Sequence, residues 1–326
     1  MKKILIFFAM LLPLAVAAQE VTDTVAKKEP IVLPPLFDYP VAPEDMDWVS
    51  RSNWLAQHFW DNFDFKNKSV GQQQLNHAFD TWVVPLNYAD KKVCEEAVTE
   101  VVKKLEKNPT LLLQFTRAAE AAFYSVTTAQ LWIDEAYLPF VRAFIANKKI
   151  PATHKTRYVY EEKRISNSLL GEQFPALDVV DRWGEKKSVV SDGKFMLIEF
   201  GDPSCSECQM ARIAMKADDL FNKAKDLDLL TIAFIMPDAD MSDTSWMSEV
   251  ADYPSDWIVA AGEGLDEIVD IKLSPGLFLV DPYGRLVLKN VDFPAIRAIL
   301  GEVINQAEAK VATESAQATE EATVAE

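Results

Sequence analysis

Two cysteines, Cys205 and Cys208, are the residues of this chain best suited to carry out chemistry. Only two residues separate them, so at a helix start their sulfurs can close into a small disulfide ring and reopen by exchange. The apolar run from Phe195 to Phe200 has the length of a buried strand, and helical periodicity begins at Met210. Free N–H groups at a helix start favour a thiolate, the reactive form of cysteine. The pattern predicts a strand, a turn and a helix that opens on a redox pair.

Two simpler interpretations of the cysteine pair are half of a zinc site and a purely structural disulfide. Zinc requires two further soft ligands nearby. The only other cysteine is Cys94, and the histidines lie far upstream, at His58, His77 and His154. We therefore predict no metal site and no cofactor. A structural disulfide stays open, because exported proteins commonly keep oxidised pairs.

One carboxylate, Glu199, lies inside the apolar run that precedes the cysteines. Burying a charge is costly, and desolvation should raise the pKa of this acid toward neutrality. Such an acid could take or relay the proton that Cys208 must lose before it reacts. The alternative is an edge carboxylate held by a lysine.

Several segments around the pair resemble the thioredoxin fold. Ser274-Pro275 precedes the apolar strand Leu277–Val280, residues 171–175 read GEQFP, and residues 281–284 read DPYG between two predicted strands. This pattern is similar to the secreted TlpA/ResA-type and AhpC/TSA-type thiol–disulfide oxidoreductases. The resemblance covers roughly residues 168–305.

The resemblance implies an α/β thioredoxin-like domain, in which helices flank a central mixed sheet. Within it, Cys205 matches the attacking cysteine and Cys208 the resolving one, and Glu199 matches a buried acid. Pro275 matches a cis-proline that faces the disulfide, and Ser274-Pro275 would present backbone groups to a substrate peptide. The implied activity is thiol–disulfide exchange through a mixed disulfide.

The sequence departs from the usual thioredoxin pattern at Ser204, which replaces a tryptophan, and at Glu207, which replaces a proline. A carboxylate between the cysteines disfavours the thiolate form, so we expect a reductant or isomerase-like enzyme. A thiol peroxidase is one alternative, although Ile198 and Asp202 stand where such enzymes place a proline and a Thr or Ser. A binding or scaffold protein with a vestigial redox site is the other alternative.

Composition and order along the chain suggest an exported protein of two domains. We predict five segments: a signal peptide (1–18), a Pro-rich linker (19–43), an all-helical domain of unknown function (44–165), the thioredoxin-like domain (168–309) with its closing helix at 293–309, and a disordered acidic tail (310–326). The leader implies a periplasmic location. The expected partners are disulfide-containing exported proteins and a membrane or periplasmic electron donor.

Charge and hydropathy exclude some classes of partner. A net charge of −17 makes nucleic acid a poor ligand, and no segment after the leader is apolar enough to span a membrane.

In the helical domain, a group of aromatic residues is expected to form part of the core. Cys94 is expected to be a small, partly buried residue rather than a third redox thiol. The helical segment resembles an uncharacterised module that precedes the redox domain in secreted thioredoxin-like proteins. The aromatic group comprises Trp54, Phe59, Trp60, Phe63 and Phe65.

Overall fold

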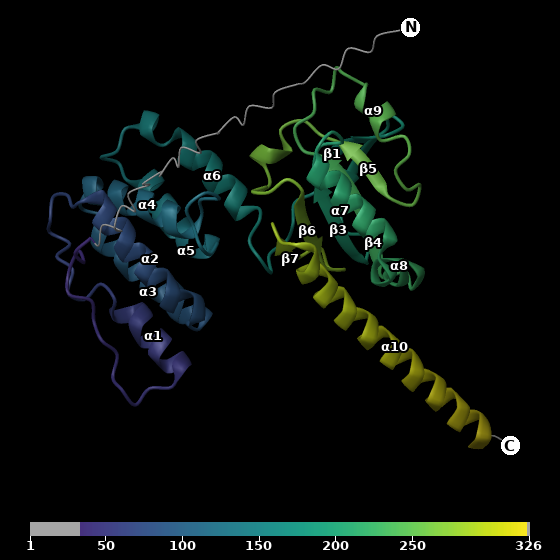
Figure 1. Cartoon of the computed structure of the whole chain (residues 1–326), viewed down its shortest axis with the longest axis horizontal. Coiled ribbons are helices and arrows are strands. Elements are labelled where there is room, and N and C mark those ends of the chain that lie inside the picture. Colours follow the sequence, from purple (N-terminus) through teal and green to yellow (C-terminus); the bar gives the residue numbers. More distant parts are fainter. Residues whose placement is uncertain (1–32, 325–326) are drawn as a thin grey trace, which may run out of the picture. The chain divides into compact units, whose positions relative to one another are not determined.

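The computed structural model describes residues 33–324, and the side chains of residues 33–313 (Figure 1). The predicted signal peptide and the first part of the linker lie outside the described residues. The chain divides into two units, Met1–Pro34 and Pro35–Glu326. The second unit contains a helical domain followed by a sheet domain.

The helical domain is built around aromatic side chains, as expected. Phe59, Trp60 and Phe63 are buried, and the ring of Trp60 lies 5.0 Å from that of Phe115, while Trp54 remains partly exposed. Local signals set the helix starts: Asn108, for example, accepts a hydrogen bond from the backbone N–H of Leu111. The elements are α1 (Trp48–His58), α2 (Gln72–Tyr88), α3 (Lys91–Leu105), α4 (Pro109–Phe123), α5 (Asp134–Ala146), η1 (Ala152–His154) and α6 (Thr156–Ser166).

The sheet domain contains seven strands in the order β2-β1-β5-β4-β3-β6-β7. Strands β3, β4 and β5 run parallel, whereas the other pairings are antiparallel, which gives the mixed sheet expected for a thioredoxin-like domain. The strands are β1 (Leu177–Asp181), β2 (Lys186–Val189), β3 (Phe195–Phe200), β4 (Leu230–Met236), β5 (Ile258–Ala261), β6 (Gly276–Val280) and β7 (Leu286–Lys289). The helices are α7 (Ser206–Ala217), α8 (Asp219–Asp226), α9 (Trp246–Glu249), η2 (Leu265–Glu267) and α10 (Phe293–Val324).

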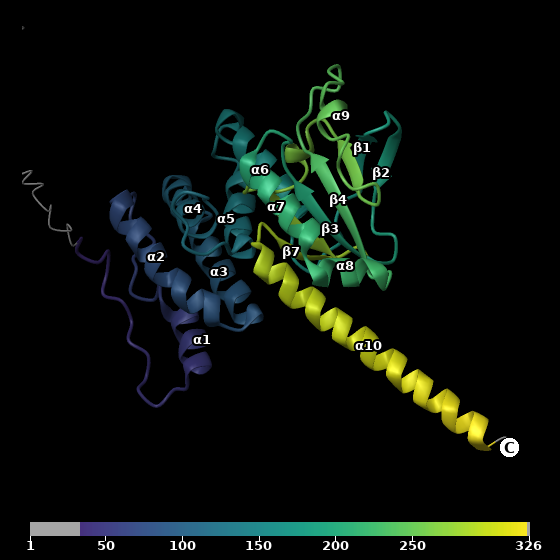
Figure 2. The same ribbon diagram turned by 45° about the vertical axis from the view of Figure 1, so that its right-hand side comes forward.

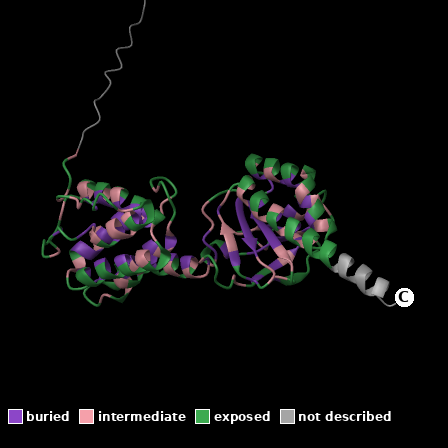
Figure 3. Cartoon of the chain, turned by 90° about the horizontal axis from the view of Figure 1, so that it is seen from below, coloured by how far each residue is buried: buried purple, intermediate pink, exposed green. Residues whose placement is uncertain are grey.

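Strand β3 alternates between two apolar layers, because successive side chains of a strand point to opposite faces. Leu197 packs with residues of α7, α8 and α10, whereas Ile198 and Phe200 pack with β1 and the η2 region on the other side. Figures 1 and 2 show α7 crossing the face of the sheet at β3 and β4. In Figure 3 the buried residues concentrate in the strands and on the inner sides of the helices. Glu199 shares the face of Leu197 and so points toward α7.

The helical periodicity after the cysteines does not continue as one helix. Asp218 ends α7 and caps α8, since its carboxylate accepts a hydrogen bond from the backbone N–H of Leu220 at 2.9 Å. At the other end of the domain, α10 runs to Val324, where we predicted disorder for residues 310–326. The tail is rich in alanine and glutamate, which are good helix formers, and an existing helix is extended at little cost.

No helix among the described residues has the length and hydropathy that a bilayer crossing requires.

Candidate active site

The redox pair lies at the first turn of α7. Cys205 is the N-cap residue, and its Sγ accepts a hydrogen bond from the backbone N–H of Cys208 at 3.2 Å. The two cysteines form a disulfide with their Cα atoms 5.2 Å apart. Cys205 is partly exposed, whereas Cys208 is fully buried. Exposure to solvent therefore distinguishes the two cysteines, as it must in an attacking and resolving pair.

Ser274 and Pro275 reach the cysteines because of the strand register. Strand β6 runs antiparallel to β3, and its first residue, Gly276, lies opposite Phe200 at the end of β3. The loop that leads into β6 and the loop that leaves β3 thus meet at one edge of the sheet. The Ser274–Pro275 peptide bond in this loop is cis.

The Ser274 side chain contacts both sulfurs. Its Oγ lies 3.6 Å from Cys205 Sγ and 3.4 Å from Cys208 Sγ. Disulfide sulfurs carry no hydrogen, so here the hydroxyl is the donor. From the sequence we expected Ser274 to contribute only its backbone groups. The contact of its hydroxyl with both sulfurs is seen only in the structure.

Glu199 is completely buried beneath this helix. In the sheet it lies between Phe234 of β4 and Leu277 of β6, so its flanking positions are apolar. Burial raises the pKa of the Glu199 carboxyl to about 8, and the nearby Arg212 guanidinium opposes that rise. An acid with such a pKa exchanges protons near neutral pH.

Arg212 is the partner of Glu199, in place of the lysine considered above, and sequence reasoning missed it. Its guanidinium donates to Glu199 Oε1 at 3.2 Å, and to the Pro203 carbonyl at 3.4 Å. It also stacks on the rings of Phe234 and Tyr253, at 4.9 and 4.7 Å. Glu199 Oε2 is buried without a hydrogen-bond partner among the described residues. The acid is therefore held at Oε1, whereas Oε2 has no partner in the described part of the chain that would stabilise its charge.

Gly201 leaves a space between Glu199 and Cys208. A Cβ there would stand 2.9 Å from Cys208 Sγ and 3.4 Å from Glu199 Oε1. Both atoms therefore border the same small volume, which any larger residue would fill. The Glu199 oxygen at this volume is Oε1, so a proton from Cys208 would reach the acid at the oxygen that Arg212 holds.

The raised pKa of Glu199 predicts how stability depends on pH. The folded protein keeps this proton up to pH about 8, whereas the unfolded chain releases it near pH 4.3, so stability should fall as pH rises between these values. We expect oxidised Glu199→Gln, which cannot ionise, to gain on the order of 3 kcal/mol over wild type between pH 5 and 9. Denaturant unfolding of both proteins across this range measures the difference, and a pH-independent difference would contradict the assignment.

Glu207 stands between the cysteines with its carboxylate exposed. Its Oε2 lies 3.8 Å from Cys205 Sγ and accepts a hydrogen bond from the Ser206 hydroxyl at 2.8 Å. That hydrogen bond lowers the pKa of Glu207, so the group is charged at neutral pH. The negative charge predicted from the sequence is thus adjacent to the sulfur of Cys205.

A pocket of about 390 Å³ lies beside the cis-proline loop. Apolar side chains dominate its lining, and Glu207 and Asp292 contribute carboxylates. An extended apolar side chain next to a substrate disulfide could bind there. The lining residues are Glu207, Ala211, Ala214, Leu273, Ser274, Pro275, Leu277, Val291, Asp292 and Phe293.

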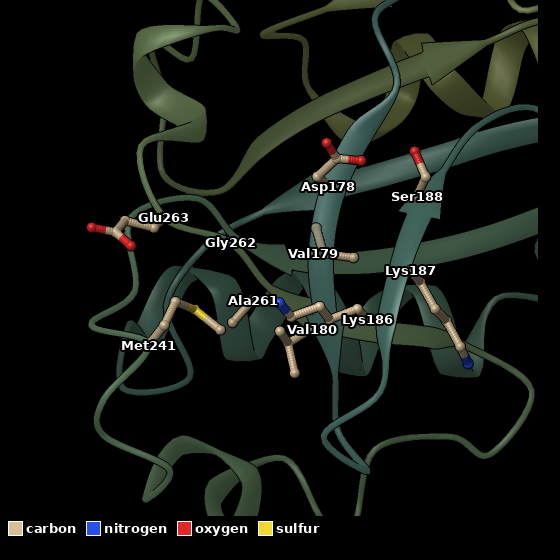
Figure 4. Close-up of a pocket in the computed structure, with 10 residues that line it drawn as sticks. All are labelled: Asp178, Val179, Val180, Lys186, Lys187, Ser188, Met241, Ala261, Gly262 and Glu263. Carbon is tan, nitrogen blue, oxygen red and sulfur yellow. The ribbon is translucent and has the colours of Figure 1, made fainter.

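A second pocket, of about 540 Å³, lies at the β1–β2 hairpin and involves none of the predicted site residues. Figure 4 shows Asp178 of β1 and Ser188 of β2, which lie opposite each other in the strand pairing. Met241 and Glu263 are contributed by loops. Acidic and basic groups, including Lys186, are mixed around it. This pocket has no connection with the redox pair.

The remaining sequence candidates lie outside the site. Cys94 is a free, partly buried thiol of α3, and burial raises its pKa to about 11, which disfavours the reactive thiolate. Among the residues described, no group of three or more His, Cys, Asp and Glu side chains could hold a metal ion. Ile198 is part of the core, and the Asp202 carboxylate accepts hydrogen bonds from Ser204. Neither side chain can donate to a peroxide.

Comparison with known proteins establishes the fold of the chain. Residues 16–168 match a family model described as a domain of unknown function, DUF5106. The chain is similar to the crystal structure of a thioredoxin-like protein from Bacteroides caccae, with a TM-score of 0.68 and 19% identity over 82% of this chain and 99% of that chain. The sheet domain thus has a thioredoxin-like fold. No curated protein matches the sequence.

Two further solved structures align with about two fifths of this chain. One is a conserved protein of unknown function from Bacteroides fragilis, with 23% identity, a TM-score of 0.37, and coverage of 41% of this chain and 99% of that chain. The other is the thioredoxin domain of a thiol-disulfide oxidoreductase from Bacteroides vulgatus, with 24% identity, a TM-score of 0.36, and coverage of 42% and 98%.

Proposed function

We propose that this chain, with its thioredoxin-like sheet domain, is a thiol–disulfide oxidoreductase. The observation that carries the proposal is the Cys205–Cys208 disulfide, in which Cys205 is a partly exposed residue, and which lies against the hydroxyl of Ser274. A purely structural disulfide needs neither an exposed cysteine nor a buried acid behind it.

The proposed reaction is carried out by Cys205, Cys208 and Glu199. The Cys205 thiolate attacks one sulfur of a substrate disulfide, whose S–S bond breaks as a mixed disulfide forms and a substrate thiolate leaves. Cys208 then gives its proton to ionised Glu199 and attacks Cys205 Sγ, which releases the second substrate thiolate. Both thiolates take protons from water, and two electrons have passed from the enzyme to the substrate. A separate electron donor must then reduce the Cys205–Cys208 disulfide.

A turnover assay tests this function. We expect the protein to accelerate the reduction of a two-chain protein disulfide by dithiothreitol at least tenfold over dithiothreitol alone. A rate equal to the uncatalysed one would contradict the proposal. If hydrogen peroxide is consumed rapidly in stopped flow while disulfides are not reduced, the protein is a thiol peroxidase instead. Inactivity in both assays would favour a scaffold with a vestigial pair.

We further propose that the pair works as a reductant or isomerase, because Glu207 places a negative charge next to Cys205. Removing this charge should stabilise the thiolate, and with it the reduced state. We expect Glu207→Gln to raise the reduction potential by up to about 30 mV, a tenfold change in the equilibrium constant. Equilibration with glutathione buffers measures it, and Glu249→Gln is a control away from the cysteines. A lowered potential in Glu207→Gln would contradict this role.

Export is part of the proposal and is supported by the sequence of residues 1–18. The substrates would be exported proteins with disulfides, and the electron donor a membrane or periplasmic protein. N-terminal sequencing of the protein from a periplasmic fraction should begin at Gln19. Recovery from the cytoplasm with Met1 intact would contradict export.

A further inference from the structure

The loop that carries Ser274 and Pro275 is also where the helical domain contacts the sheet domain. Lys272 lies three residues before the cis-proline, and its side chain is only 4% exposed. Its ammonium group lies 2.6 Å from Asp134 Oδ1, in the first turn of α5, and 3.7 Å from Asp270 Oδ2. A buried lysine so close to the redox pair is therefore held by a carboxylate of the other domain.

Further contacts from the helical domain surround the same lysine. The Lys272 ammonium lies over the rings of Tyr124 and Trp132, 4.1 and 5.0 Å from their centroids. A second lysine, Lys289 of β7, pairs with the other oxygen of Asp134 at 2.5 Å. Two carboxylates and two ammonium groups therefore balance in a nearly closed cluster, which we call the junction cluster: Asp134, Asp270, Lys272 and Lys289.

The backbone of the loop is anchored on both sides of Lys272. The Tyr124 hydroxyl donates to Asp270 Oδ1 at 2.7 Å, and the Asp270 N–H donates to Ser168 Oγ at 3.0 Å. Asn290 accepts from the Lys272 N–H and donates to the Asp270 carbonyl, both at 2.8 Å. Residues 270–272 are thus fixed by groups from both domains.

Only Leu273 separates this anchored stretch from Ser274, whose Oγ touches both sulfurs. On the other side, Gly276 is already in register with Phe200. With both ends fixed and few free dihedral angles between them, the position of Lys272 determines where Ser274 and Pro275 stand relative to Cys205.

An apolar junction would hold two domains together at least as well. Buried ion pairs repay their desolvation only with good geometry, and replacing them by apolar residues is often neutral or stabilising. A charged cluster also fixes how the two domains are placed against each other, because each ion pair can form at only one relative position. The cost of burying four charges next to the active site fits a positioning role better than a role in adhesion.

We propose that the helical domain, through Asp134 and the Lys272 that it holds, positions the Ser274–Pro275 loop against the redox cysteines. Asp134 and Lys272 are then positioning residues, and the helical domain is a working part of the enzyme. The inference rests on the proposed exchange activity, but the geometry of the loop can be measured independently of activity.

Lys272→Met in the full chain is the main test, since it leaves Asp134 paired with Lys289 and Asp270 bonded to Tyr124. We expect its kcat/KM for protein-disulfide reduction to fall at least tenfold, and amide hydrogen exchange in residues 270–277 to accelerate at least tenfold. Lys272→Arg keeps the charge and should stay within threefold of wild type. Arg142→Met removes an exposed α5–α6 pair with Glu162 and should change neither readout.

If Lys272→Met does not fold, Asp134→Asn provides the same comparison with the shape of the side chain kept. The proposal is overturned if the folded variant has a lower melting temperature but keeps kcat/KM and loop exchange within twofold of Arg142→Met. If wild type shows no turnover, the proposed function fails, and loop exchange alone then decides whether the junction cluster positions the loop.

Discussion

Replacing Cys205 with serine is expected to abolish catalysed disulfide reduction, so that the rate falls to that of dithiothreitol alone. The hydroxyl of serine is not ionised at neutral pH and cannot form a mixed disulfide, so no later step can take place. Serine fits the site, and the fold should be kept. The turnover assay with dithiothreitol measures the loss.

Cys208→Ser separates the two cysteine roles. Cys205 can still attack, but nothing resolves the product, so a mixed disulfide with the substrate should accumulate on Cys205. Cys94→Ser is the matched control and should behave like wild type, because this buried thiol lies outside the site. Full activity in Cys205→Ser, or trapping on Cys94, would contradict the assignment of the nucleophile.

Replacing Glu199 with glutamine is expected to slow turnover on the order of a hundredfold, the usual contribution of a positioned general base. Glutamine has nearly the shape of the protonated acid but cannot accept the Cys208 proton. Only ionised Glu199 can take that proton, so the wild-type rate of the resolving step should rise with pH up to about 8. Single-turnover kinetics against pH should show this titration in wild type and not in Glu199→Gln.

Arg212→Met tests the same proton path from the other side. Arg212 lowers the pKa of Glu199, so its removal should move the titration to higher pH by one unit or more. The variant would then be slow at pH 7 and recover as pH rises. In the Glu199→Gln background the same change should cost little, because the acid that it acts on is gone. Equal losses in both backgrounds would contradict the coupling.

The positions of the site residues could be predicted largely from local sequence. The spacing of Cys205 and Cys208, the charge within an apolar strand and the Ser274-Pro275 pair are all short-range signals, and the structure brings these residues to one edge of the sheet. Their catalytic roles stay predictions until the variants are measured.

Arg212 could not be found in the same way. The helical periodicity that begins at Met210 favours Met210 and Ile213 as buried positions, yet these residues are 66% and 61% exposed. The buried stripe of α7 is Cys208, Arg212 and Met215. An arginine on a helix is normally solvated, and its burial here is accounted for by its contacts with Glu199, the Pro203 carbonyl and two aromatic rings. A search for a cation to balance Glu199 would have been the one available signal.

The junction cluster was beyond sequence reasoning for another reason. Asp134 and Lys272 are 138 positions apart, and nothing local distinguishes them from surface charges. Their pairing depends on how two domains pack, which hydrophobic periodicity does not encode. The C-terminal tail is helical to Val324 because its alanines and glutamates favour a helix, although its low hydrophobicity predicts disorder.

The most direct test of the central claim is a count of thiols before and after a single turnover. Fully reduced protein mixed with excess peptide disulfide should release two peptide thiols per chain, and peptide mapping should then find one new disulfide, between Cys205 and Cys208, with Cys94 still free. Release of no thiol, or a new disulfide that involves Cys94, would show that this pair does not exchange with substrates.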